Sequence, residues 1–293
     1  MLAFLKQTIT FNLSIDMQHT EFTWTTPDGV SIFAQTWSPD TPPRAVVALA
    51  HGLGEHAGRY AHVARFFADN GIATVAYDRR GHGKSGGKRG HTPDYAFYLD
   101  EVETLVAKAK TQFPNLPAFL YGHSMGGNII LNYALRRNIS GIAGVISSAA
   151  VIKLAFRPNP IVLALGKLTK IIYPTFTQKN QLDVAALSRD QTVVDAYVAD
   201  PLVHDSLTSV AGLGILEYAD YLCNNATKFP VPLYITHGSD DRLTSSPGSE
   251  WFAKNYTGDI KLKIWNGLYH EIHNEPEQAD VLGEMVAWMN GLI

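Results

Sequence analysis

The chain has 293 residues, of which 46% are hydrophobic and 17% are charged, and its formal net charge at pH 7 is −3. This balance is typical of a globular protein and argues against a disordered chain. No run of basic residues is present, which argues against a nucleic-acid partner. The single cysteine, Cys223, rules out an intramolecular disulfide and favours a reducing, cytoplasmic compartment. No stretch reaches the roughly 18 apolar residues that a membrane-spanning helix needs.

The first sixteen residues, MLAFLKQTITFNLSID, differ in pattern from the rest of the chain. Lys6 interrupts their apolar part and polar residues follow it, so the segment is a poor match to a cleaved signal peptide. We therefore expect residues 1–16 to be a leader or a disordered N-terminus, with Met17 as a candidate for the true start.

Strands and helices then alternate, which is typical of a mostly parallel sheet covered by helices on both faces. An opening antiparallel hairpin is expected first, and the later strands are continuous apolar runs, as in doubly covered sheets. A helix capped by Asp100 is expected between the second and third of these later strands. The predicted strands are 22–25, 31–37, 45–50, 72–77, 118–121, 141–147, 231–236 and 261–265, and the other predicted helices are 60–70, 127–137 and 276–289.

The alternation stops between residues 151 and 222, where apolar pieces and prolines occur without a clear strand. We expect residues 17–150 and 223–293 to form one α/β core. Residues 151–222 then form a mostly helical cap, or lid, over the carboxyl edge of the sheet, where open α/β sheets bind ligands.

The strongest chemical motif is Gly122-His123-Ser124-Met125-Gly126. The Gly-x-Ser-x-Gly pattern is weak by itself, but here it follows an apolar strand and precedes a helix, as the nucleophile elbow of the α/β-hydrolase fold requires. The two glycines leave room in a tight turn, and the start of the helix favours negative charge beside Ser124. The alternative interpretation is a glycine-rich turn with an incidental serine.

The acid and the base of such a site follow the serine in the order Asp or Glu, then His. The loop after strand 231–236 contains Asp240 and Asp241, and the loop after the last strand contains His270. Spacing alone does not separate the two aspartates, and His273 lies close enough to His270 to face the same cleft.

Two backbone N–H groups are expected to form an oxyanion hole. One belongs to Met125, directly after the nucleophile, and the other is assigned to Leu53 in the glycine-rich loop 51–56. The alternative for that loop is a plain turn between a strand and a helix. A second glycine-rich loop, 78–85, lacks phosphate-binding spacing, and no Cys/His cluster has zinc spacing, so neither a metal nor an organic cofactor is predicted.

These motifs resemble those of the monoglyceride lipases and the related lysophospholipases. The similarity runs from about residue 21 to the end of the chain, and its first loop is more specific than the elbow. The matching segments are 51–60 (HGLGEHAGRY), 77–85 (YDRRGHGKS), 122–127 (GHSMGG), 238–243 (GSDDRL), Tyr269-His270 with His273 and, in the cap, 187–189, 194–197 and 200–202.

The resemblance implies a serine esterase that hydrolyses monoacylglycerols to fatty acid and glycerol through an acyl-enzyme, without a cofactor. It implies a catalytic triad of Ser124, Asp241 and His270, because the acid of the family directly precedes Arg-Leu. The amides of Leu53 and Met125 become the oxyanion hole. Leu53 stands where the family usually has a smaller residue, which would narrow the pocket.

The resemblance also places Glu55, Arg59, Tyr197 and His273 around the glycerol end of the site. The alternative is that these residues form a polar network that only supports the loop. Residues 156–179 depart most from the family, which leaves the length of the acyl chain open.

Other functions remain as alternatives: a lysophospholipase or a broad carboxylesterase with the same triad, a peptidase of this fold, or a non-catalytic lipid-binding protein. The apolar run 161–165 is flanked by Lys153, Lys167 and Lys170. It indicates either transient contact of the cap with a membrane surface or the inner lining of the cap.

Overall fold

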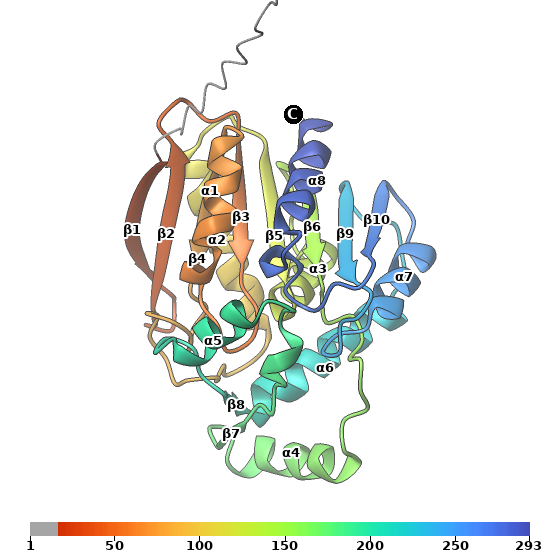
Figure 1. Ribbon diagram of the computed structural model, residues 1–293. Helices are drawn as coiled ribbons and strands as arrows, with labels where there is room; N and C mark the ends of the chain where they lie inside the picture. Colours follow the sequence, from red (N-terminus) through yellow and green to blue (C-terminus); the bar gives the residue numbers. More distant parts are fainter. Residues whose placement is uncertain (1–16) are drawn as a thin grey trace, which may run out of the picture.

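A computed structural model describes residues 17–293, and the predicted leader lies outside the described residues. Eight strands form one sheet in the order β1-β2-β4-β3-β5-β6-β9-β10 (Figure 1). The hairpin of β1 (Met17–Thr25) and β2 (Ser31–Pro39) is antiparallel, and β2 also pairs antiparallel with β4 (Ile72–Tyr77). The strands from β4 to the far edge pair in parallel: β3 (Ala45–Ala50), β5 (Ala118–His123), β6 (Ile142–Ser148), β9 (Leu233–Gly238) and β10 (Ile260–Trp265).

The continuous apolar strands are explained by burial on both faces. In β3, Val46 and Ala48 belong to one hydrophobic cluster, whereas Val47 and Leu49 belong to the other, because successive side chains of a strand point to opposite faces. Helices α1 (Ala61–Asp69) and α8 (Gln278–Asn290) contribute to the second cluster. The predicted α/β fold with a mostly parallel sheet is therefore confirmed.

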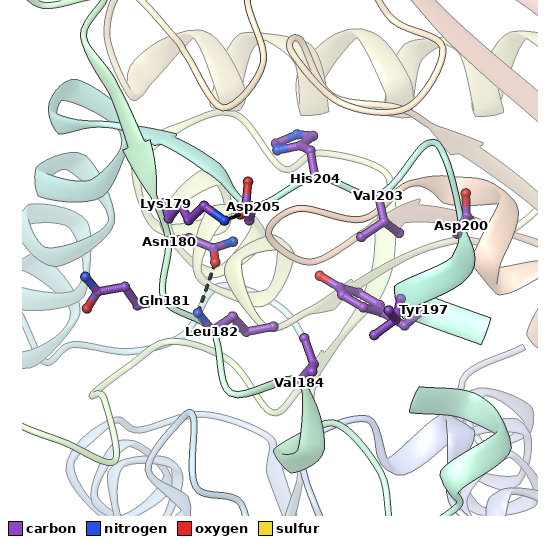
Figure 2. Close-up of a pocket in the computed structure, with 11 residues that line it drawn as sticks. Lys179, Asn180, Gln181, Leu182, Val184, Tyr197, Asp200, Val203, His204 and Asp205 are labelled. Carbon is purple, nitrogen blue, oxygen red and sulfur yellow. Dashed lines mark hydrogen bonds and ion pairs between the residues drawn. The ribbon is translucent and has the colours of Figure 1, made fainter. Parts of the chain in front are cut away.

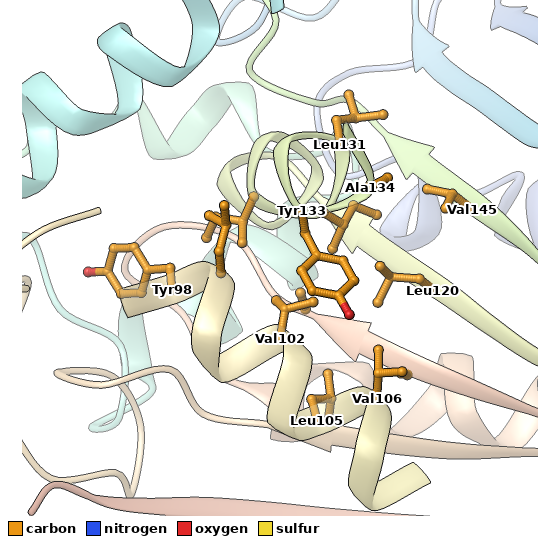
Figure 3. Packing of buried hydrophobic residues seen from close by; sticks show 14 of the residues in the cluster. Tyr98, Val102, Leu105, Val106, Leu120, Leu131, Tyr133, Ala134 and Val145 are labelled. Carbon is orange, nitrogen blue, oxygen red and sulfur yellow. The ribbon is translucent and has the colours of Figure 1, made fainter. Parts of the chain in front are cut away.

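The first cluster lies between the sheet and helices α2 (Ala96–Gln112), α3 (Met125–Arg136), α6 (Ser209–Asn224) and α7 (Ser246–Asn255). Figure 3 shows its centre, where side chains of α2 and α3 meet those of the sheet. The residues in contact there include Tyr98, Val102, Leu105, Val106, Leu120, Leu131, Tyr133, Ala134 and Val145.

The predicted cap of one helix is wrong. Helix α2 begins at Ala96, and the Oδ1 atom of Asp94 accepts a hydrogen bond of 2.8 Å from the Ala96 N–H group. Asp100 lies inside the helix instead, where its carboxylate pairs with Arg137 at 3.0 Å. Helix α7 was not predicted from the sequence.

The six elements of the chain between β6 and β9 lie beyond the carboxyl ends of the parallel strands, at the bottom of Figure 1. The prediction of no strand there is corrected, because β7 and β8 form a short antiparallel pair. Helix α6 packs against both α4 and α3, so the predicted boundary at residue 222 falls inside a helix that joins this layer to the core. The elements are α4 (Pro160–Ile172), β7 (Thr177–Lys179), the 3₁₀ turn Val184–Ala186, α5 (Gln191–Ala199), β8 (Ser206–Thr208) and α6.

None of the helices within residues 17–293 is long and apolar enough to cross a membrane.

The first turn of α3 lies directly against the end of β3. A Cβ atom added to Gly126 would stand 2.1 Å from the carbonyl oxygen of Ala50 and 2.6 Å from that of His51. A Cβ atom on Gly122 would stand 2.6 Å from the carbonyl oxygen of Gly126. Both glycines are therefore required by backbone-to-backbone packing, which fixes the turn between β5 and α3.

We predict that Gly126→Ala lowers the free energy of unfolding by at least about 1–3 kcal/mol, because rigid backbone must move to admit the methyl group. Gly283→Ala in α8 is the matched control, since a Cβ atom there meets nothing within 4 Å. It should stabilise the protein by up to about 1 kcal/mol through helix propensity. Urea unfolding measures both, and equal stability of the two variants would contradict the packing argument.

Candidate active site

Ser124 occupies the sharp turn between β5 and α3. Its backbone has φ 56° and ψ −117°, an uncommon conformation for a residue other than glycine. Three hydrogen bonds hold the turn: the Ser124 N–H donates to the carbonyl of Ser148 at 2.9 Å, and the Ser124 carbonyl accepts from the N–H groups of Asn128 at 3.0 Å and Val151 at 3.2 Å. Strain of this kind is common at functional sites, where surrounding structure over-determines it.

Asp241 and His270 lie on loops that follow β9 and β10. The Nδ1 atom of His270 is 2.7 Å from Oδ2 of Asp241, and both residues are buried. The neighbouring Asp240 is exposed and accepts a hydrogen bond from Ser239 instead. The structure therefore brings Asp241, and not Asp240, to the histidine.

In this pair, each residue shifts the pKa of the other in the direction that favours its charged form. Burial raises the pKa of Asp241, but His270 and His237 outweigh it and hold that pKa well below its ordinary value. Burial lowers the pKa of His270, but the Asp241 carboxylate outweighs it and raises that pKa above 6.5. Because Nδ1 faces Asp241, Nε2 is the ring nitrogen left to exchange a proton with a neighbour.

Two residues that the sequence analysis did not identify also contact the Asp241 carboxylate. The Nε2 atom of His237 is 2.9 Å from Oδ2, and the Thr244 hydroxyl donates to the same oxygen at 2.7 Å. The only available signal was their position four residues before and three residues after Asp241, which is too common to single them out.

Ser124 and His270 line the same cavity, which has a volume of about 350 Å³. Leu53 and Met125 line it as well. Most of the other lining comes from the layer beyond the strands and is apolar, and it includes Leu154, Phe156, Val162, Leu163, Leu182, Leu207, Leu213, Ile215 and Leu216.

The loop that carries Leu53 is fixed by hydrogen bonds to buried charged side chains. The fully buried guanidinium of Arg79 donates to the carbonyl oxygens of His51 and Gly52, and the Gly52 N–H donates to Glu55 at 2.5 Å. Within residues 17–293, neither the Leu53 N–H nor the Met125 N–H donates to another protein group. Both amides are therefore free to donate to an oxygen atom in the cavity.

The residues assigned by resemblance to the glycerol end form a buried network. Arg59 donates to Glu55 at 2.5 Å and to both carboxylate oxygens of Glu271 at 2.7 Å, and its guanidinium lies over the Tyr197 ring at 4.7 Å. Glu271 was missed by the sequence analysis, although it directly follows His270. Burial raises its pKa, but the Arg59 charge outweighs burial and brings that pKa down to about 2.

His273 lies between aromatic rings, 4.8 Å from the Tyr60 ring and 4.7 Å from the His123 ring. Burial lowers its pKa to about 3, so its ring is neutral at physiological pH. Among the described residues, neither ring nitrogen of His273 has a hydrogen-bond partner.

None of Glu55, Arg59, Tyr197 and His273 is among the described residues that line the cavity at Ser124. Tyr197 lines a second, more polar cavity of about 650 Å³ (Figure 2). Residues 179–182 line both cavities and so stand between them. The contacts of the four residues thus fit a network that supports the loop, and their contact with substrate stays a prediction.

The parallel sheet, the strained serine turn and the buried Asp–His pair together define a protein of the α/β-hydrolase class. Comparison with known proteins supports this, since the family described as "Serine aminopeptidase, S33" matches residues 41–277. The monoacylglycerol lipase of Mycolicibacterium smegmatis is 41% identical over 263 residues, covering 89% of this chain and 93% of that protein. The human monoglyceride lipase is 32% identical, covering 90% and 88%.

A solved structure agrees with these relatives. The crystal structure of the Paleococcus ferrophilus monoacylglycerol lipase superposes with a TM-score of 0.78 at 28% identity, covering 95% of this chain and 100% of that one. The chain belongs to the monoglyceride lipase family of α/β-hydrolases.

We predict that Arg59→Met lowers the free energy of unfolding by about 3–5 kcal/mol at pH 7, because it leaves buried carboxylates without their cation. In the wild type, the depressed pKa of Glu271 contributes stability above pH 4.5, and this is lost as the pH falls toward 2. The deficit of the variant should therefore be largest at neutral pH and shrink as the pH falls toward 2, because the carboxylate becomes protonated earlier in the variant than in the wild type.

The matched control is Arg65→Met, which removes an exposed ion pair with Asp69 at 3.0 Å. Its expected effect is below about 1 kcal/mol. Chemical unfolding from pH 3 to pH 8 measures both variants. A deficit for Arg59→Met that does not change with pH would contradict the electrostatic explanation.

Proposed function

We propose that the protein is a serine ester hydrolase that cleaves monoacylglycerols to a fatty acid and glycerol. The observation that carries this proposal is the buried Asp241–His270 pair, whose histidine lines the same apolar cavity as Ser124. The substrate class rests on the monoacylglycerol and monoglyceride lipases among the relatives.

Each residue has a distinct part in the proposed reaction. The Ser124 hydroxyl attacks the ester carbonyl, and His270 takes its proton at Nε2 and then gives it to the leaving alcohol. Asp241 holds the imidazole in the required tautomer and stabilises its protonated form. Water then attacks the acyl-enzyme in the same way and releases the fatty acid.

The oxyanion that forms in both steps is assigned to the N–H groups of Leu53 and Met125. Each such donor is worth roughly 3–4 kcal/mol of transition-state stabilisation. The Met125 amide also lies in the first turn of α3, where the helix dipole favours negative charge.

The cavity favours one aliphatic chain as the acyl group. Its walls between α4 and α6 are aliphatic, and its apolar lining extends away from Ser124 into the layer beyond the strands. Burial of each methylene group of the substrate there is worth about 0.8 kcal/mol.

We predict that Ser124→Ala abolishes hydrolysis of monooleoylglycerol, with a loss on the order of 10⁶-fold in kcat, and also abolishes labelling by a fluorophosphonate probe. Wild-type enzyme should hydrolyse the monoacylglycerol faster than lysophosphatidylcholine or an acyl-peptide amide. Fatty-acid release measured for the three substrates tests the assignment. Full activity of Ser124→Ala would refute the mechanism, and faster release from lysophosphatidylcholine would overturn the substrate class.

We also propose that α4 rests on a membrane surface while substrate enters. The apolar run of this helix faces two ways: Leu163 lines the cavity, whereas Ile161, Leu165 and Ile171 are exposed by 68%, 56% and 81%. Lys167 and Lys170 of the same helix are also exposed, and Lys170 pairs with Glu217 of α6 at 3.9 Å. An amphipathic surface of this composition favours anionic lipid interfaces.

We predict that the double variant Leu168→Glu, Ile171→Glu binds anionic phospholipid vesicles on the order of tenfold or more weakly, since two aliphatic side chains no longer insert. Its hydrolysis of a soluble short-chain ester should not change. Ile293→Glu is the control, because that exposed side chain lies at the opposite end of the molecule (Figure 1). Vesicle co-sedimentation measures binding, and unchanged binding of the double variant would disprove the contact.

A further inference from the structure

A second imidazole reaches the carboxylate of Asp241. His237 lies in β9 and is fully buried. Its Nε2 atom is 2.9 Å from Oδ2 of Asp241, and its Nδ1 atom is 2.8 Å from the hydroxyl oxygen of Ser249 in α7. The Asp241 carboxylate is thus linked through His237 to a helix that carries none of the residues assigned to the reaction.

The direction of these hydrogen bonds follows from the ionised state of Asp241. A carboxylate only accepts hydrogen bonds, so Nε2 of His237 carries the hydrogen that points to Oδ2. In the neutral ring Nδ1 is then an acceptor, and the Ser249 hydroxyl donates to it. Ser249 therefore fixes both the tautomer of His237 and the plane of its ring.

The two oxygens of Asp241 have different surroundings. Oδ1 accepts from the backbone N–H groups of Leu243 at 2.7 Å and Thr244 at 3.0 Å. Oδ2 faces three donors, which are His270 at 2.7 Å, the Thr244 hydroxyl at 2.7 Å and His237 at 2.9 Å. The Thr244 hydroxyl also lies 2.9 Å from the Ala149 carbonyl, so its single hydrogen is shared between two acceptors. His237 is therefore the donor that shares the Oδ2 atom of Asp241 with His270 most directly.

We propose that His237 is a positioning residue for the reaction, which holds Oδ2 of Asp241 toward His270 and takes up part of the negative charge that Asp241 offers to that histidine. The proposal rests on the function proposed above. It requires an N–H donor at this place, and not merely a side chain that fills the space.

The charged and titratable groups around His270 are known from the structure. Asp241 contacts it from the β9 loop, His123 lies 4.7 Å away at the end of β5, and Glu55 and Glu271 act at longer range. As the base, His270 must be neutral, so kcat/KM should rise as the pH passes through its elevated pKa, above 6.5. This rise is the acid limb of the pH profile. The pH at which it occurs measures how strongly the Asp241 carboxylate stabilises the protonated form of His270.

The test compares three variants of the whole protein. His237→Leu removes the donor but keeps an apolar side chain in the core, whereas His237→Gln keeps an N–H group near the position of Nε2. Ser249→Ala leaves the imidazole in place but frees its tautomer and its plane. Asp240→Asn is the matched control, because this exposed carboxylate next in sequence makes no contact with His270.

His237→Leu should move the acid limb of kcat/KM to higher pH by up to about one unit, because His270 then receives more of the Asp241 charge. Its kcat should fall on the order of tenfold, with KM little changed, because the carboxylate is less well oriented. His237→Gln should restore most of both properties, Ser249→Ala should shift the limb in the same direction by less, and Asp240→Asn should match the wild type.

An unchanged acid limb and kcat in His237→Leu would overturn the proposal, as would a defect in His237→Gln equal to that of His237→Leu. If His237→Leu does not fold, Ser249→Ala decides: an upward shift supports the proposal and no shift overturns it. Failure of the proposed function is distinguishable, because the titration of the His270 imidazole can be followed by NMR without any substrate. The midpoint of that titration should move in the variants even if the wild type hydrolyses no monoacylglycerol.

Discussion

The active site depends on the close packing of α3 against the end of β3. Gly126 brings the helix backbone against the carbonyl oxygens of Ala50 and His51, and Gly122 lets the turn close on itself. The result is a serine held at a positive φ, at the start of a helix and beside the loop that carries Leu53. The nucleophile and the oxyanion donors are therefore positioned by the same rigid contact between α3 and the end of β3. Their relative position is set by backbone packing and not by flexible side chains.

A second feature of the site is that each of its buried charged groups is held by an opposite charge or by several hydrogen bonds. Asp241 is satisfied by five donors, and Arg59 is held between Glu55 and Glu271. Among residues 17–293, no carboxylate pairs with Arg79, which donates to backbone carbonyls instead. Each arrangement fixes one loop at the carboxyl edge of the sheet. Stability and preorganisation of the site therefore come from the same contacts.

The sequence was sufficient for the order and type of the sheet elements, because burial on both faces gives each central strand an unbroken apolar run. It was insufficient where a boundary depends on one contact. Helix α2 starts after Asp94 and not at Asp100, and α7 begins with Ser246-Pro247-Gly248, which resembles a loop even though proline is well suited to a first helical turn.

The candidate site shows the same division. Chain order placed an acid and a base after the serine, but spacing did not separate Asp241 from Asp240. The family resemblance favoured Asp241, and the fold brings that side chain to His270 because neighbouring residues in a turn point in different directions. Glu271 was missed because its partner Arg59 comes from a distant segment, and His237 because a histidine four residues before an aspartate is too common a pattern to single out. The residues at the predicted glycerol end were named from resemblance, but their burial and ion pairing arise only in the folded chain. An apolar run such as 161–165 likewise carries no sign of which side faces the cavity.

The origin of the cavity walls has an evolutionary consequence. Ser124, Asp241 and His270 come from strand ends of the sheet, whereas most of the apolar lining comes from the layer that contains α4 and α6. Reactivity and substrate range are thus encoded by largely separate sets of residues. Sequence drift in α4 can reshape the compartment for the acyl chain while the proton-transfer geometry is conserved, so a lineage can acquire new lipid preferences without rebuilding its chemistry.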